Sequence, residues 1–189
     1  PLAFPQGLCK IPFEQQEAQL KAHAFTPDQR LSAARQADRI LFRSGCSVVA
    51  DVSTNPHFIP LKKNSPIQYV DFPTDGAFQR ICPRSLAYQD PSFDFETLLK
   101  GESDRILLGT HSLTTCPSLQ LLDELLFIQQ FSSFSLEHTL PMICSQAAQA
   151  LQVETQYGTL EPGKKPGLVL ISGVDFQNFR LLPQARAAR

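Results

Sequence analysis

The chain has 189 residues, enough for one sizeable domain but short for two. It is 42% hydrophobic and 19% charged, with a net charge of −1, and its cationic residues are scattered. This composition is ordinary for a globular protein and lacks the basic patch that nucleic-acid binding requires. No apolar stretch approaches the roughly 18–20 residues that cross a bilayer. The sequence therefore predicts neither a nucleic-acid-binding protein nor a membrane protein.

The five cysteines are odd in number and widely spaced, and none of them forms a C-x-x-C pair. This usage is typical of reduced thiols, so we expect a cytoplasmic protein. The chain begins with "PLAFPQG", without an initiator methionine, and shows no signal peptide. We therefore expect its natural beginning to be absent.

The first strong structural signal is a helix over residues 26–45. Thr26 is the expected N-cap, Pro27 fits the first helical position, and Gln29 completes a capping box. Gly45 is placed to end this helix in a left-handed conformation. A weaker pattern predicts a short helix over 14–24.

The rest of the chain alternates between short apolar runs and helical patterns. The sequence predicts strands at 46–53, 67–72, 80–83, 105–109 and 168–171. Between them it predicts a proline-rich loop at 54–66, a helix at 92–101 with Ser92 as its cap, a helix at 117–131, and a helix at 135–151 disturbed at Pro141. The polar tail is expected to fray. This alternation favours right-handed βαβ units and a parallel sheet, which is an α/β fold.

Polar residues follow three of the predicted strands, where α/β proteins place their sites. These stretches are 51–55, 82–85 and 110–112. His111 could ligate a metal or act as an acid or base, and the alternative is a histidine that hydrogen-bonds a neighbouring loop. Asp51 needs a partner: either a metal or the backbone N–H groups of the loop that it opens.

Two further residues have open alternatives. Arg84 could clamp a carboxylate or phosphate, or form a surface salt bridge. Cys82 could act as a nucleophile only beside a histidine, and a buried structural thiol is the stronger interpretation. The sequence contains no H-x-H, H-E-x-x-H or G-x-S-x-G motif and no glycine-rich phosphate loop.

The stretches "ICPRSLAYQD", "RILLGTHSL", "LLDELLFIQQF" and "AAQALQVETQYGTLEPGKKPGLVLI" occur in this order over 81–171. Together they resemble the last part of the metal-dependent amidohydrolase superfamily, in the branch of cytosine deaminases, chlorohydrolases and aminodeoxyfutalosine deaminases. The resemblance implies a partial (β/α) TIM-barrel over 1–160. It also implies a C-terminal strand and tail over 161–189 that would join a small β-sandwich.

The resemblance implies a hydrolase that uses zinc or iron to activate water against a non-peptide C–N bond, for example in deamination of a purine-nucleoside-like small molecule. His111 occupies the position of the superfamily's strand-eight aspartate. It is therefore the candidate catalytic residue and the candidate metal ligand. Arg84, Ser85 and Ser112 are the candidate substrate-binding residues.

The chain departs from the superfamily pattern at several points. The H-x-H of strand one and the segment holding strands four to six, with two histidines, have no counterpart. Leu86 and Cys116 replace asparagines of the motifs. The alternative hypothesis is a catalytically inactive remnant that serves as a binding or partner subunit, or has no function. A partial barrel leaves open sheet edges, so we also expect a homodimer or poor solubility.

Overall fold

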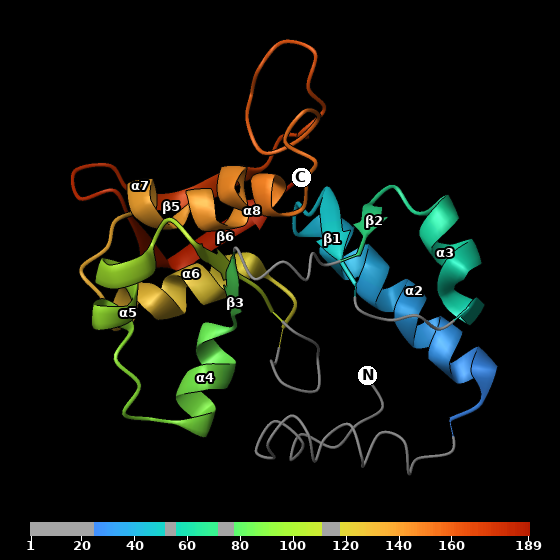
Figure 1. The fold of residues 1–189 in the computed structure, drawn as a ribbon, viewed down its shortest axis with the longest axis horizontal. Coiled ribbons are helices and arrows are strands. Elements are labelled where there is room, and N and C mark those ends of the chain that lie inside the picture. The colour runs from blue at the N-terminus through green and yellow to red at the C-terminus, as the bar shows by residue number, and fades with distance from the viewer. Residues whose placement is uncertain (1–24, 52–55, 72–77, 111–117) are drawn as a thin grey trace.

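The computed structural model describes residues 25–51, 56–71, 78–110 and 118–189 of the chain. Figure 1 shows two groups of elements side by side: α2, β1, α3 and β2 form one, and the elements from β3 to β6 form the other. The elements of the first group are α2 (Pro27–Arg43), β1 (Val48–Ala50), the 3₁₀ helix η2 (Pro56–Phe58), α3 (Ile59–Asn64) and β2 (Gln68–Val70). Those of the second are β3 (Gln79–Ile81), α4 (Pro83–Gln89), α5 (Phe95–Glu102), β4 (Ile106–Leu108), α6 (Leu121–Gln130), α7 (Leu136–Thr139), η3 (Pro141–Ile143), α8 (Ser145–Ala150), β5 (Leu170–Asp175) and β6 (Arg180–Ala188).

The long helix α2 confirms the prediction from the capping signals. The Thr26 hydroxyl accepts a hydrogen bond from the Gln29 backbone N–H at 3.2 Å, and the Gln29 side chain accepts one from the Thr26 N–H at 3.0 Å. This reciprocal pair satisfies N–H groups that a helix start leaves without intrahelical partners. Gly45 has a φ of +98°, which ends the helix as predicted.

Residues 56–64, between β1 and β2, are helical and form η2 and α3, so the prediction of a proline-rich loop is wrong over these residues. Pro60 is the second residue of α3, where its missing N–H costs no intrahelical hydrogen bond, so the proline marks a helix start. This turn of helix returns the chain so that β2 pairs in parallel with β1.

The second group is built on the parallel pair β3–β4 and contains most of the buried core. Ile106 and Leu108 of β4 pack with Phe95, Leu99 and a set of apolar side chains from α6 and η3. Helix α4 begins at Pro83, directly after β3, and was not predicted. Helix α5 was predicted, but its N-cap is Asp94, which accepts the Thr97 N–H at 3.0 Å, and not Ser92.

The last third of the chain shows one confirmed prediction and one error. The helix predicted over 135–151 is divided at Pro141 into α7, η3 and α8, as its lack of an N–H requires. The tail is not frayed, because β6 pairs antiparallel with β5 and packs on α6. The Arg180 guanidinium donates to the carbonyl oxygens of Gln129, Ser132 and Phe134, which fastens the hairpin to the end of α6.

The expected parallel sheet is present only in pieces. The described residues form three separate two-stranded sheets, β1–β2, β3–β4 and β5–β6, and no closed barrel. The first two pairs are parallel, which is the pairing predicted for βαβ units. The fold of the described chain is therefore a partial α/β arrangement. None of its helices combines the length and apolar character that a bilayer crossing demands.

Candidate functional site

A cavity of about 380 Å³ lies where the two groups of elements meet. Val48, Val49 and Ala50 of β1 line it on one side, and Leu107 and Leu108 of β4 line it on the other. Successive side chains of a strand point to opposite faces, so one face of a strand would contribute only every second residue to a cavity wall. Here consecutive residues line the cavity, which means that each strand turns its edge toward this space. Asp51 and Thr110, which follow the two strands, also line it. We call this space the strand-end cavity.

Three charged residues, Asp51, Lys62 and Arg80, are among the described residues that line the strand-end cavity. The Lys62 Nζ of α3 lies 2.7 Å from the Asp51 carboxylate, with 23% and 28% of the two side chains exposed. The same Nζ lies 5.8 Å from the centre of the Tyr69 ring, within range of a cation–π contact. Arg80 of β3 lines the cavity as well. Most of the remaining lining is apolar, so a few polar groups project into an apolar space, which is typical of small-molecule sites.

Tyr69 is held in place by a buried carboxylate on α2. Its hydroxyl donates to Asp38 Oδ1 at 2.8 Å, and the Ser65 hydroxyl donates to the same oxygen at 2.5 Å. Burial, followed by the hydrogen bond to Asp38, raises the pKa of Tyr69 above its ordinary value. The phenol therefore stays protonated and acts as a fixed wall of the cavity, not as a base.

The thiol of Cys46 also lines the cavity. Burial raises its pKa, and this effect outweighs the hydrogen-bonding contact with Ser44 and the charge of Arg189, both of which lower it. A thiol with a raised pKa is a poor nucleophile because the thiolate is the reactive form. Cys46 therefore contributes apolar surface to the cavity.

Arg84 is engaged in a network between α4 and α6. Its Nε donates to Glu124 Oε1 at 2.6 Å and its backbone N–H donates to Glu124 Oε2 at 3.0 Å. The guanidinium also donates to the Ser118 hydroxyl at 3.1 Å and lies 3.6 Å from the Asp123 carboxylate. The Glu124 side chain is fully buried, so this ion pair lies inside the protein and is not the surface salt bridge considered from the sequence.

The other predicted site residues fall into two groups. Ser85 is buried on α4, and it does not line the strand-end cavity, nor does Arg84. Whether either binds a substrate stays a prediction. His111 and Ser112 lie outside the described residues, and so do positions 52–55. Of the first predicted stretch the structure therefore describes Asp51, whose carboxylate pairs with Lys62.

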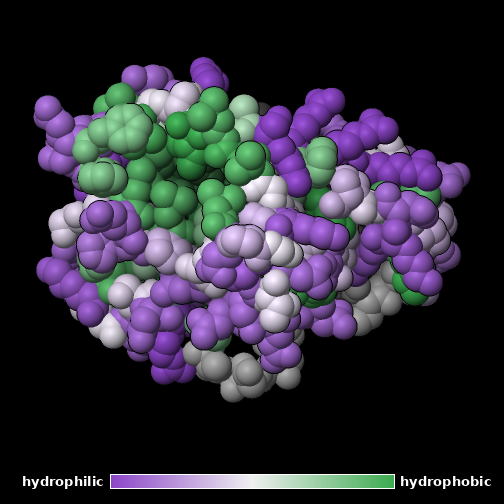
Figure 2. All heavy atoms as spheres, turned by 90° about the horizontal axis from the view of Figure 1, so that it is seen from above, coloured by the Kyte–Doolittle hydropathy of each residue, from purple (hydrophilic) through white to green (hydrophobic). Residues whose placement is uncertain are grey.

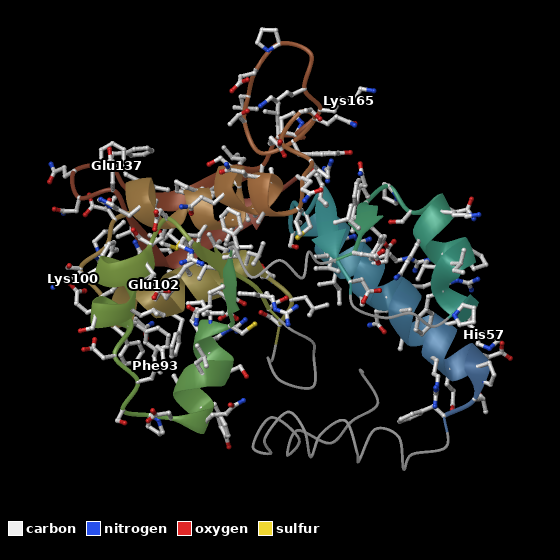
Figure 3. All side chains as sticks on the ribbon, in the orientation of Figure 1. His57, Phe93, Lys100, Glu102, Glu137 and Lys165 are labelled. Carbon is white, nitrogen blue, oxygen red and sulfur yellow. The ribbon has the colours of Figure 1, made fainter. Side chains whose placement is uncertain are left out.

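The described residues do not fit a zinc or iron site. Within 25–51, 56–71, 78–110 and 118–189, no group of three or more His, Cys, Asp or Glu side chains is arranged to hold a metal ion. The carboxylate of Asp51, which lines the cavity, already forms an ion pair. His57 lies at the outer edge of the molecule, on the opposite side from Lys100 and Glu102 (Figure 3). His138 lies on α7, with its Nδ1 3.0 Å from the Ser135 hydroxyl oxygen.

The sequence model of the amidohydrolase family matches residues 29–186, which is most of the chain. The chain belongs to the amidohydrolase family. The match supports the superfamily resemblance and a general relation to hydrolases, and members of this family are generally metal-dependent. Comparison with curated proteins and with solved structures gave no significant match.

Three cavity residues were missed by the sequence analysis: Lys62, Tyr69 and Arg80. Lys62 lay in the segment interpreted as a loop, although Pro60 was a signal for a helix start. Tyr69 and Arg80 lie within predicted strands, where alternation alone does not tell which side chain borders a cavity. The rule for strand ends selected three stretches: the described residues of the first and last, Asp51 and Thr110, line the strand-end cavity, whereas residues 82–85 do not.

Proposed function

We propose that this amidohydrolase-family chain binds a small organic anion with an apolar body in the strand-end cavity. The observation that carries the proposal is the composition of the lining: Lys62 and Arg80 contribute positive charge and Asp51 negative charge to an otherwise largely apolar space. Among the described lining residues two cationic side chains stand against one anionic side chain, which favours a carboxylate or a similar anion. The position at the ends of β1 and β4 is where α/β folds bind ligands.

The Asp51–Lys62 pair gives the site a defined way to recognise an anion. The Lys62 ammonium group carries the positive charge that would attract an anion, and its ion pair with Asp51 fixes where that charge lies. The Tyr69 ring beside Lys62 restricts the position of the ammonium group, and Asp38 fixes that ring in turn. A bound carboxylate would therefore meet a positive charge of fixed position beside apolar walls.

The test uses 2-naphthoate, a fluorescent aromatic carboxylate, with its neutral analogue naphthalene-2-carboxamide as the charge control. We expect saturable binding of one naphthoate per chain, and at least threefold weaker binding of the amide. Ala50→Phe, which fills the cavity, should abolish binding, whereas Ala188→Phe on the exposed end of β6 should not. Equal binding by both variants, or no binding by the natural chain, overturns the proposal.

The family match favours metal-dependent hydrolysis of a non-peptide C–N bond as a second candidate function. Deamination of a purine-nucleoside-like substrate is the specific form that the superfamily resemblance suggests. The test is the metal content of the purified chain together with ammonia release from adenosine-like compounds. Stoichiometric zinc or iron with ammonia release supports the hydrolase. Less than one equivalent of metal without ammonia release supports binding alone.

A further inference from the structure

The wall of the strand-end cavity includes the start of α6. Leu119 and Leu121 both line the cavity, and only 5% of Leu119 is exposed. The residue between them, Gln120, is the N-cap of α6, but its side chain makes no capping hydrogen bond. A helix start without such a bond lacks one of its usual local restraints. Contacts with other elements therefore contribute to the position of this part of the wall.

Arg84 of α4 supplies such contacts from one guanidinium group. Its Nη2 donates to the Ser118 hydroxyl at 3.1 Å and to the Ser118 carbonyl oxygen at 3.4 Å, directly before Leu119. Its Nε donates to Glu124 Oε1 at 2.6 Å, and its Nη1 lies 3.6 Å from the Asp123 carboxylate. One side chain therefore ties the segment that enters α6 to the first turn of that helix.

The residues Arg84, Ser118, Asp123 and Glu124, which we call the α6 clamp, form a closed set of polar contacts. The Ser118 hydroxyl, which accepts from Arg84, donates in turn to the Asp123 carboxylate. The Glu124 side chain is fully buried, and 17% of the Arg84 side chain is exposed, so water has little access to the clamp. A guanidinium presents its N–H groups in a rigid plane that a lysine ammonium cannot reproduce. Arg84→Lys therefore keeps a positive charge opposite Glu124 but should release Ser118.

None of the four clamp residues is among the described residues that line the strand-end cavity. Any effect of the clamp on the cavity therefore passes through Leu119 and Leu121. We infer that Arg84 is a positioning residue that fixes the wall made by Leu119 and Leu121 and thereby sets the width of the apolar body that the cavity accepts. The inference rests on the proposed function, because the ligand is the same organic anion. It adds that a group outside the cavity selects among such anions.

The test compares 2-naphthoate with benzoate, which carries the same carboxylate on a single ring, by calorimetry. The natural chain should bind 2-naphthoate at least about tenfold more tightly, because its second ring removes more apolar surface from water. Arg84→Lys should reduce this ratio to about threefold or less, because dispersion contacts weaken steeply once the wall is no longer held against the ring. Ser118→Ala, which leaves the Arg84–Glu124 ion pair in place, should also lower the ratio.

Two control variants separate positioning from stability and from binding elsewhere. Gly163→Ala places its new Cβ in open space and should destabilise the fold without changing the ratio. Figure 2 shows a broad apolar area on the surface seen from above, which offers an aromatic ligand a second place to bind. Leu160→Ser removes an apolar side chain from a residue that is 75% exposed, and it should also leave the ratio unchanged.

A measurement without ligand tests the positioning itself. In spectra of the chain labelled at its leucine methyl groups, the signals of Leu119 and Leu121 should shift or broaden in Arg84→Lys and in Ser118→Ala. The signals of Leu168, which is 73% exposed, should not change. Unchanged Leu119 and Leu121 signals, or an unchanged binding ratio in a folded Arg84→Lys or in Ser118→Ala, overturn the inference.

The two measurements also tell failure of the inference from failure of the proposed function. If 2-naphthoate binds the natural chain but the variants keep its ratio to benzoate, the inference falls and the proposed function stands. If 2-naphthoate does not bind the natural chain, both fall, whatever the methyl signals show. If Arg84→Lys does not fold, Ser118→Ala decides.

Discussion

The buried pair Arg84–Glu124 gives the most sharply defined stability prediction. Glu124 is fully buried, and Arg84, whose side chain is 17% exposed, donates to both of its carboxylate oxygens. Glu124→Gln keeps the shape but removes the negative charge and places an amide N–H₂ group among N–H donors. Removing one partner of a buried ion pair costs about 3–5 kcal/mol. We expect about 3 kcal/mol, the lower end, because water reaches part of the Arg84 side chain.

The assay is urea unfolding followed by circular dichroism, with thermal unfolding as a second readout. A loss of about 3 kcal/mol corresponds to a fall in Tm of about 6–12 °C for a chain of this size. The control is Glu137→Gln on α7, where the side chain is exposed at the outer edge of the molecule (Figure 3). It should change the free energy of unfolding by no more than about 0.5 kcal/mol.

A double variant separates the unpaired charge from the lost hydrogen bonds. Arg84→Met combined with Glu124→Met leaves no unpaired charge on either residue, so it should be more stable than the sum of the two single losses predicts. The reasoning is refuted if Glu124→Gln is no less stable than Glu137→Gln. It is also refuted if the double variant shows the full sum of the single effects.

Three further predictions concern acid stability, a glycine and association. Hydrogen bonds from the Ser133 N–H and hydroxyl, together with Lys100, lower the pKa of Glu96 from 4.5 to about 2. The contribution of Glu96 to stability is therefore present above pH 4.5 and is lost as the pH falls toward 2. Glu96→Gln should flatten the plot of unfolding free energy against pH in this range and Glu102→Gln should not, so equal plots for the two variants would contradict the assignment. Gly158→Ala should destabilise the fold by at least about 2 kcal/mol, because φ is +91° and the new Cβ would lie 2.6 Å from the Ala148 Cβ. Gly163→Ala, which has open space around it, should cost about 1 kcal/mol. Similar urea midpoints for the two variants would contradict this difference. We also propose that the chain forms a homodimer through the exposed apolar side chains of the β5–β6 hairpin, which include Leu170, Phe176 and Leu182. Analytical sedimentation should show a dimer whose fraction rises with concentration and falls in the Phe176→Ser variant. A monomer at all concentrations would exclude the homodimer.

The sequence predicted local structure well where the signal was chemical and local. The capping box at Thr26, the break at Pro141 and the parallel pairing of β1 with β2 all follow from short-range rules. The helix α3 was missed because Pro60 was interpreted only as a loop residue, although a proline also fits the first turn of a helix. The β5–β6 hairpin was missed because Arg180 and α6, 51 residues apart, stabilise it through a tertiary contact.

The candidate site was predictable in position but not in detail. The rule that sites lie at strand ends brought Asp51 and the end of β4 together. It could not show that Lys62 neutralises Asp51, since that contact depends on the helix that the sequence analysis missed. Nor could it show that Glu124 takes up Arg84, because the two residues are 40 positions apart and meet only through the packing of α4 on α6.

The binding site itself can be tested directly by nuclear magnetic resonance of the isotope-labelled chain titrated with 2-naphthoate. The account predicts that the largest amide shifts occur at Val49, Ala50 and Gly109, beside the strand-end cavity, and saturate together at one ligand per chain. The turn between β5 and β6, at 176–179, serves as the internal control and should not move. Shifts confined to that turn, or an unchanged spectrum at saturating ligand, would contradict the central claim that this amidohydrolase-family chain binds an organic anion at the ends of β1 and β4.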